Sequence, residues 1–322
     1  MKIVVCIRQG LDGEISPFDA CAYEEALKIN GAEITLLSMG VPSASDFLLK
    51  LTRLGAKSAI LLSDKAFAGS DTLATAYALS LAIKKLSPDL VFCGRQTLVG
   101  DTAQTPVMLS QMLEYGLITN VMSIDSVTEH GIECTTRCEG SVNAEMPALI
   151  TVERINTLRL PRLRSKLGSI EIWNSETVGA DISKCGLSGS PTRVLKTFEN
   201  QSGKRKCTFI PRSKLEWAIE EGLRRNADRV NSSTESTCER LGKVFIVGDA
   251  PRAFACTVGN SVTDIGYADA DTDTVASLIK SGNPDAVIWG SDTRSKRLSS
   301  QVAAILGLGL CADCTRLECA DG

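Results

Sequence analysis

The chain contains a single histidine and few aromatic residues. Of its 322 residues, only His130 is histidine, and Phe, Trp and Tyr together make up 5%. A Ser-His-Asp or Cys-His mechanism would have to use His130, which lies in the polar turn 128–131, and nothing around it supports such a role. The scarcity of aromatic side chains leaves little for base stacking with single-stranded nucleic acid.

Strong charge of one sign and long hydrophobic runs are also absent. A net charge of −3 excludes bulk electrostatic binding to nucleic acid or to an anionic membrane. The longest apolar runs, such as residues 59–62 and 90–93, are far shorter than the roughly 20 residues that cross a bilayer. The first residues, MKIVVCIRQG, predict a β-strand rather than a signal peptide. We therefore expect no membrane insertion.

Cysteine is abundant but scattered. Twelve cysteines are present, and Cys311 and Cys314 form a C-x-x-C pair without a partner pair. Zinc sites of this type need four ligands, so we expect no metal site. Free thiols without an export signal fit a reducing cytoplasm.

A segment of the chain occurs twice. Residues 87–117 and 283–310 each contain a turn, a buried strand, a glycine loop and a helix, and both close on Gly-Leu. This repeat predicts duplicated α/β units. The matching positions are Pro88/Pro284, Asp89/Asp285, Val91/Val287, Gly94/Gly290 and Thr97/Thr293.

The first half of the chain alternates strands and helices, which indicates a doubly wound, mostly parallel sheet of the α/β class. Short extended segments at 121–127, 133–137 and 148–152 predict either a small antiparallel addition or strands that finish the first sheet. The expected strands are residues 2–7, 33–39, 59–62 and 90–93, and the expected helices are 19–30, 43–54, 71–86 and 102–113.

The second half has a different character. Residues 168–207 are rich in Gly, Ser, Thr and Pro and predict an extended arm. We expect a first domain over residues 1–165, an arm, helix and linker over 166–242, and a partial α/β domain over 243–322. The predicted elements after the arm are a helix at 213–225, a polar hinge at 226–242, strands at 244–248, 264–269 and 285–290, and helices at 273–280 and 298–306.

The strongest candidate site is the loop GRQTLVGDTAQT at residues 94–105. Ligands of doubly wound sheets bind beyond the carboxyl ends of the strands, where this loop lies. Gly94 and Gly100 allow a close approach, and Arg95 adds a cation. Phosphate binding at a helix amino terminus and an ordinary loop capped by Asp101 are both consistent with this pattern. The backbone N–H groups at the start of the helix come from Thr102, Ala103, Gln104 and Thr105.

Two further groups of charged residues are weaker candidates. Asp19, Glu24 and Glu25 form either a carboxylate cluster or, as the favoured interpretation, an N-cap followed by two glutamates on a solvated face. The arginines of residues 154–164 fit either a phosphate-binding or acidic-partner site or a solvated basic loop.

The first 225 residues resemble the β subunit of electron transfer flavoproteins. The motifs CGRQ and GDTAQ are similar to those of the flavin-bifurcating branch of this family. Residues 243–319 resemble the amino-terminal domain of the α subunit, most clearly at GLGLCADCTRLEC. The resemblance implies an adenine nucleotide α-hydrolase-like fold. It rests on the ordered blocks KIVVCIRQ, SPFDACAYEEAL, the SMG turn, LGAKSAILLSDKAFAGSDTLATAYAL, PDLVFCGRQTLVGDTAQ, MPALITV and GSPTRVLKTF.

The resemblance implies a cofactor site for FAD, or alternatively AMP. It further implies an electron carrier without catalytic residues for an organic substrate, and possible flavin reduction by NADH. The expected partners are an α-type chain that carries the missing flavin domain, an acyl-CoA dehydrogenase-like protein, and a ferredoxin or flavodoxin. An AMP-binding structural subunit is the alternative. Besides the loop residues above, the implied site residues are Cys6, Arg8, Ser38, Met39, Asp71, Thr75 and Gln96.

Overall fold

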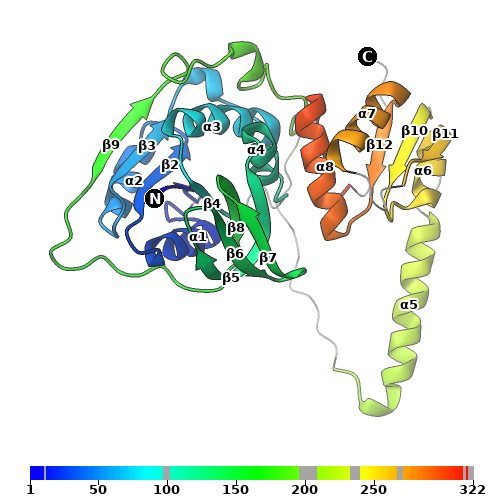
Figure 1. The fold of residues 1–322 in the computed structure, drawn as a ribbon. Helices are drawn as coiled ribbons and strands as arrows, with labels where there is room; N and C mark the ends of the chain where they lie inside the picture. Colours follow the sequence, from blue (N-terminus) through cyan, green and yellow to red (C-terminus); the bar gives the residue numbers. More distant parts are fainter. Residues whose placement is uncertain are drawn as a thin grey trace. The chain divides into compact units, whose positions relative to one another are not determined.

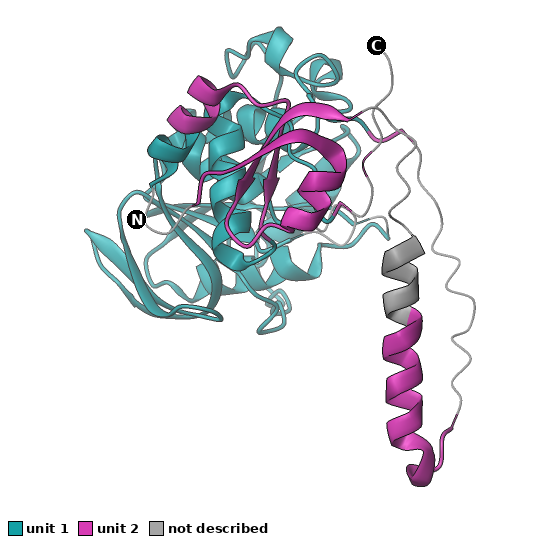
Figure 2. Ribbon diagram, turned by 90° about the vertical axis from the view of Figure 1, so that its right-hand side faces the viewer, with its two compact units in different colours: residues 1–193, 271–276, 291–313 teal, residues 194–270, 277–290, 314–322 magenta. Residues whose placement is uncertain are grey.

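A computed structural model describes residues 1–10, 12–96, 102–195, 209–232, 240–266, 271–314 and 317, without the side chains of 226–232. The chain forms two compact units (Figure 2). The first contains Met1–Arg193, Asp271–Ala276 and Ser291–Asp313, and the second contains Val194–Ala270, Ser277–Gly290 and Cys314–Gly322.

The first unit is built on a nine-stranded, mostly parallel sheet (Figure 1), as the alternating pattern predicts. Its strand order is β7-β6-β5-β8-β4-β1-β2-β3-β9. The strands are β1 (Lys2–Cys6), β2 (Glu33–Met39), β3 (Ser58–Leu62), β4 (Leu90–Gly94), β5 (Gly116–Val127), β6 (Gly131–Thr136), β7 (Gly140–Glu145), β8 (Ala148–Val152) and β9 (Ser169–Trp173). The helices are α1 (Pro17–Lys28), α2 (Ala44–Thr52), α3 (Thr72–Leu86), α4 (Thr105–Leu113) and α8 (Thr293–Leu306).

The central strands are apolar on both faces because helices cover both faces. Successive strand residues point to opposite sides of a sheet. Leu36 therefore packs in one core cluster with residues of α1 and α2, and Leu37 packs in the other with residues of α3 and α4. This explains why β1, β2 and β4 read as continuous hydrophobic runs.

The extended segments after residue 116 fulfil both interpretations of the sequence. β8 pairs in parallel with β4 and with β5, and so finishes the parallel sheet. β6 and β7 add an antiparallel extension to β5. Strand β7 was not predicted, because its sequence GSVNAE is mostly polar and exposed, and its apolar alternation is limited to Val142 and Ala144.

The predicted irregular arm contains a strand, which is a correction to the sequence interpretation. β9 pairs in parallel with the edge strand β3, from Ser58↔Ser169 to Leu62↔Trp173. Backbone pairing satisfies the open edge of β3, and Trp173 and Ile170 of β9 pack against the core, while its other residues are exposed.

Helix α8 belongs to the first unit, although it lies far along the sequence. Its Ala303 is buried in the same cluster as Met108 of α4, and Gln301 Nε2 lies 3.4 Å from Gln111 Oε1. α4 and α8 are the helices of the two repeat copies, so the copies contribute neighbouring helices to one core.

The second unit contains a three-stranded parallel sheet in the order β11-β10-β12. The predicted hinge at 226–242 is wrong at its start, because α5 continues to Ser232. The predicted strand at 264–269 overlaps β11 only at Asp264, and α6 was not predicted. The remaining elements of the chain are α5 (Leu215–Ser232), β10 (Leu241–Val247), α6 (Arg252–Val258), β11 (Gly259–Asp264), α7 (Thr272–Gly282) and β12 (Ala286–Trp289). Within the described parts of the chain, no helix has the length and apolar character needed to span a bilayer.

Candidate functional site

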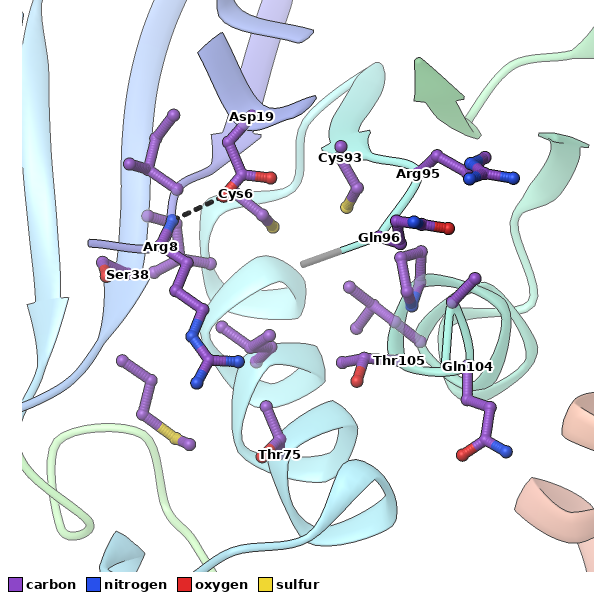
Figure 3. Close-up of a pocket in the computed structure, with 18 of the residues that line it drawn as sticks. Cys6, Arg8, Asp19, Ser38, Thr75, Cys93, Arg95, Gln96, Gln104 and Thr105 are labelled. Carbon is purple, nitrogen blue, oxygen red and sulfur yellow. Dashed lines mark hydrogen bonds between the residues drawn. The ribbon is translucent and has the colours of Figure 1, made fainter. Parts of the chain in front are cut away.

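A cavity of about 310 Å³ lies beyond the carboxyl ends of β1, β2 and β4 (Figure 3). The ends of these strands and the first residues of α4 line it, together with Thr75 of α3. It lies where ligands of doubly wound sheets bind.

The structure brings together most of the residues that the sequence singles out. Asp71 does not line the cavity, and Gly100 and Asp101 lie outside the described residues. The candidates that line the cavity are Cys6, Arg8, Ser38, Met39, Thr75, Gly94, Arg95, Gln96, Thr102, Ala103, Gln104 and Thr105.

Helix α4 begins later than predicted, at Thr105 instead of residue 102. Ala103 has a φ of 55°, in the left-handed region that non-glycine residues seldom adopt. This turn places Gln104 at the N-cap, and Pro106 occupies the first helical turn, where its missing N–H is tolerated. The amino terminus of α4 borders the cavity, and the helix dipole favours negative charge there.

Asp19 lies at the point where β1, β4 and α1 meet. Its Oδ2 accepts a hydrogen bond from the Arg8 backbone N–H at 2.8 Å, and the Gly94 N–H also donates to its carboxylate. Burial raises the pKa of Asp19 to about 7, although these hydrogen bonds and the Arg8 charge act in the opposite direction. Asp19 therefore links two strand ends that line the cavity.

The sequence interpretation of Asp19 as an N-cap is wrong. The N-cap of α1 is Ser16, Pro17 follows it, and Asp19 lies inside the first turn. The cavity contact of Asp19 was also missed, because the sequence does not show which helix start faces the end of β4. The signal in the sequence that could have indicated this contact is the position of Asp19, shortly after the loop that follows β1.

Two arginines place positive charge at the cavity. Arg8 and Arg95 both line it, and Figure 3 shows the Arg8 side chain extending along one side. The Arg95 guanidinium carbon lies 5.4 Å from the centre of the Phe18 ring, and its Nε lies 3.4 Å from Oε2 of buried Glu153. Such groups bind phosphate through charge-assisted hydrogen bonds.

Cys6 and Cys93 also line the cavity, and Cys93 was not among the predicted site residues. A hydrogen bond to Cys6 and burial raise the pKa of the Cys93 thiol well above its usual range. All the cysteines in the described part of the chain are free thiols.

Asp71 is an N-cap, as its place before α3 predicts. Its Oδ1 accepts from the Ala74 N–H at 3.0 Å, and its Oδ2 accepts from the Thr192 backbone N–H at 3.1 Å and from Thr192 Oγ1 at 2.7 Å. Asp71 therefore fixes the arm beside α3 and does not contact the cavity.

The expectation of a solvated glutamate face on α1 is wrong. Glu24 and Glu25 are both buried, and Asn156 donates to Glu25. Arg159 makes an ion pair with Glu24, whereas Arg162 and Arg164 are exposed, as expected for a basic loop. Across the described ranges, no group of three or more His, Cys, Asp and Glu side chains is arranged to hold a metal ion.

Comparisons with known proteins match this chain over most of its length. The profile described as "Electron transfer flavoprotein domain" matches residues 3–177 and 261–322. "Protein FixA" of Azorhizobium caulinodans is 41% identical over 223 residues, which cover 63% of this chain and 79% of the relative.

Two further relatives cover a similar share. "Electron transfer flavoprotein subunit beta" of Clostridium acetobutylicum is 35% identical over 208 residues, or 59% of this chain and 78% of the relative. "Caffeyl-CoA reductase-Etf complex subunit CarD" of Acetobacterium woodii is 37% identical over 211 residues, or 61% of this chain and 80% of the relative.

Proposed function

Because the chain belongs to the electron transfer flavoprotein family, we propose that its cavity binds the adenosine phosphate part of FAD. The single observation that carries this proposal is the convergence of Arg8, Arg95 and the start of α4 on one cavity at the strand ends. These groups supply positive charge and N–H donors for phosphate.

The size of the cavity supports binding of one half of a dinucleotide. Its volume of about 310 Å³ is at the lower end of the range of about 300 to 1,000 Å³ for small-molecule sites. The hydroxyl groups of Ser38, Thr75 and Thr105 provide donors and acceptors for ribose and phosphate, and Leu37 and Leu109 provide apolar contacts for a base. The residues present therefore fit the adenine nucleotide half.

The chain acts as an electron carrier rather than as an enzyme with its own organic substrate. FAD, when bound, supplies the redox chemistry, and the protein positions it and tunes its surroundings. Arg8 and Arg95 neutralise phosphate, while Asp19 holds the loops that present them. The electrons come from NADH or a dehydrogenase and pass to another redox protein.

The partner in this proposal is an α-type chain that carries the electron-transferring flavin domain. Residues 1–165 form the β-type domain, 166–242 the arm and linker, and 243–322 an α-type segment fused to it. The packing of α4 against α8 supports a fusion in which the repeat copies are joined. The further partners are an acyl-CoA dehydrogenase-like protein and a ferredoxin or flavodoxin, and the name of the CarD relative refers to a complex with caffeyl-CoA reductase.

An AMP-binding structural subunit without a redox role is the second candidate. The same cavity volume supports it, because a mononucleotide fills a space of this size without a second half.

The test is an absorbance spectrum of the purified chain, followed by chromatography of the ligand released on denaturation. Absorbance near 450 nm with released FAD is the expected result, and bleaching by NADH supports the redox role. A colourless protein that releases AMP would favour the structural subunit. A protein that binds neither FAD nor AMP, alone or with an α-type chain, would overturn both.

A further inference from the structure

Two thiols face each other on the strand side of the cavity. Cys6 is the last residue of β1, and Cys93 lies in β4. The parallel register pairs Val5 with Phe92, and Cys6 and Cys93 are the residues that directly follow these two in β1 and β4. Cys6 is near enough to raise the pKa of the Cys93 thiol, and Figure 3 shows both residues beside Asp19.

The geometry of the sheet suits a bond between the two sulfur atoms. Neighbouring strands lie about 4.8 Å apart, within the Cα separation of about 4.4 to 6.8 Å found across disulfides. Facing residues of neighbouring strands point to the same side of a sheet. In agreement, Cys6 packs against the core cluster that contains Cys93.

The two thiols differ in accessibility. Cys93 is 4% exposed, whereas Cys6 is only partly buried. The neighbouring Cys6, burial and the Asp19 charge raise the pKa of the Cys93 thiol, which favours its protonated form. Since Cys6 is the more exposed of the two, a peroxide reaches it first, and Cys93 lies beside it to resolve the product.

We propose that Cys6 and Cys93 form a dithiol site that reacts as one unit with peroxides and closes reversibly to a disulfide. The Cys6 sulfur attacks the peroxide O–O bond, becomes a sulfenic acid and releases one water. The Cys93 sulfur then displaces the hydroxyl group as a second water and forms the S–S bond. The two thiols lose two electrons and two protons, and hydrogen peroxide is reduced to two waters.

The disulfide changes the cavity. It removes two S–H groups from the lining and joins the ends of β1 and β4 next to Arg8 and Gly94. We expect adenine nucleotide affinity to fall by about five-fold or more on oxidation, a coupling of ordinary size between two sites. This affinity effect rests on the proposed nucleotide site, whereas formation of the disulfide does not.

The experiment is peptide mapping of the full chain after treatment with hydrogen peroxide and alkylation of the remaining thiols. Trypsin places Cys6 and Cys93 in separate peptides with one cysteine each, residues 3–8 and 86–95. The expected result is one linked species with the mass of both peptides less two hydrogens, which disappears on treatment with dithiothreitol. Cys6→Ser and Cys93→Ser each abolish it.

Cys21→Ser is the matched control. Cys21 is also buried in the first unit, but its thiol donates to the backbone oxygen of Asn156 and has no thiol partner among the described residues. This variant keeps the linked species. Recovery of the two wild-type peptides unlinked after oxidation, or of Cys6 linked to another cysteine, would overturn the proposal.

AMP binding to the reduced and oxidised chain is then measured by calorimetry. If the disulfide is found by mapping but the chain binds no adenine nucleotide, the result supports the dithiol site. It then counts only against the proposed function. Unchanged AMP affinity after complete oxidation would overturn the proposed link between the two.

Discussion

The guanidinium group of Arg159 lies on the carboxylate of Glu24, with Nη2 2.8 Å from Oε1 and Nε 3.0 Å from Oε2. The backbone N–H of Arg159 donates to the same carboxylate at 3.0 Å. These contacts hold the pKa of Glu24 below its usual range, although burial raises it. One side chain of α1 therefore anchors the segment that follows β8.

Glu24→Ala should destabilise the first unit by about 1 to 3 kcal/mol, because it leaves the Arg159 donors without their carboxylate. The urea midpoint measures this. Lys57→Ala is the matched control, since it breaks the exposed Lys57–Glu33 ion pair, and little or no loss of stability is expected from it. Equal losses in both variants would show that Glu24 contributes no more than a surface pair.

The pKa of the Asp19 carboxyl should be about 7, far above the usual value of 3.8. Because its pKa is raised in the folded state, the protonated carboxyl stabilises the native state. This contribution is complete at pH values below the unfolded-state pKa, and it is lost as the pH rises through the folded-state pKa. Between about pH 4 and 7 the wild type should therefore lose stability relative to Asp19→Asn. A carboxyl ¹³C chemical-shift titration of Asp19 with its midpoint near 4 would contradict this.

Gly94→Ala should disturb the cavity, because its new Cβ would lie 2.4 Å from Asp19 Oδ1 and 2.7 Å from the Asp19 backbone nitrogen. Overpacking of this kind costs about 1 to 3 kcal/mol, and the shift of α1 should weaken nucleotide binding. Thermal unfolding and AMP calorimetry measure both effects.

Gly40→Ala is the control for Gly94→Ala. Gly40 directly follows β2 as Gly94 ends β4, but its added Cβ would meet nothing closer than 3.9 Å. We expect little change in stability or affinity. A Gly94→Ala variant that behaves like Gly40→Ala would contradict the close approach of α1 to β4.

Arg95→Ala should weaken AMP binding by about ten-fold or more. One charge-assisted hydrogen bond contributes about 1.5 to 3 kcal/mol, and its loss lowers the affinity by this factor. Arg137→Ala is the matched control. Arg137, like Arg95, lies beside Glu153, with its Nη1 3.7 Å from the Glu153 carboxylate, but Arg137 does not line the cavity. Calorimetry should show a loss only for Arg95→Ala. The same loss in both variants would mean that the charge around Glu153 acts from a distance.

The parallel core of the first unit could be predicted because its strands and helices carry strong local signals. β1, β2 and β4 are continuous apolar runs, and Asp71 marks the start of α3. Strands β7 and β9 could not be predicted, since backbone pairing with a neighbour holds them while most of their side chains are exposed.

The candidate site was predicted from the loop after β4, but its supporting residues were not. Asp19 and Cys93 become cavity residues only because β1 and β4 are neighbours, and neighbours in a sheet come from long-range contacts. In the same way, Glu24 appears solvated in its helix sequence until Arg159 packs on it from a distant segment.

The pairing of β9 with β3 also has a consequence for the newly made chain. β3 ends at Leu62, whereas β9 begins at Ser169, so more than one hundred residues are synthesised before the edge of β3 is covered. At about 5 to 20 residues per second, this takes roughly 5 to 20 seconds. During that interval the nascent polypeptide on the ribosome exposes an unpaired strand edge, the feature that draws chaperones and neighbouring chains.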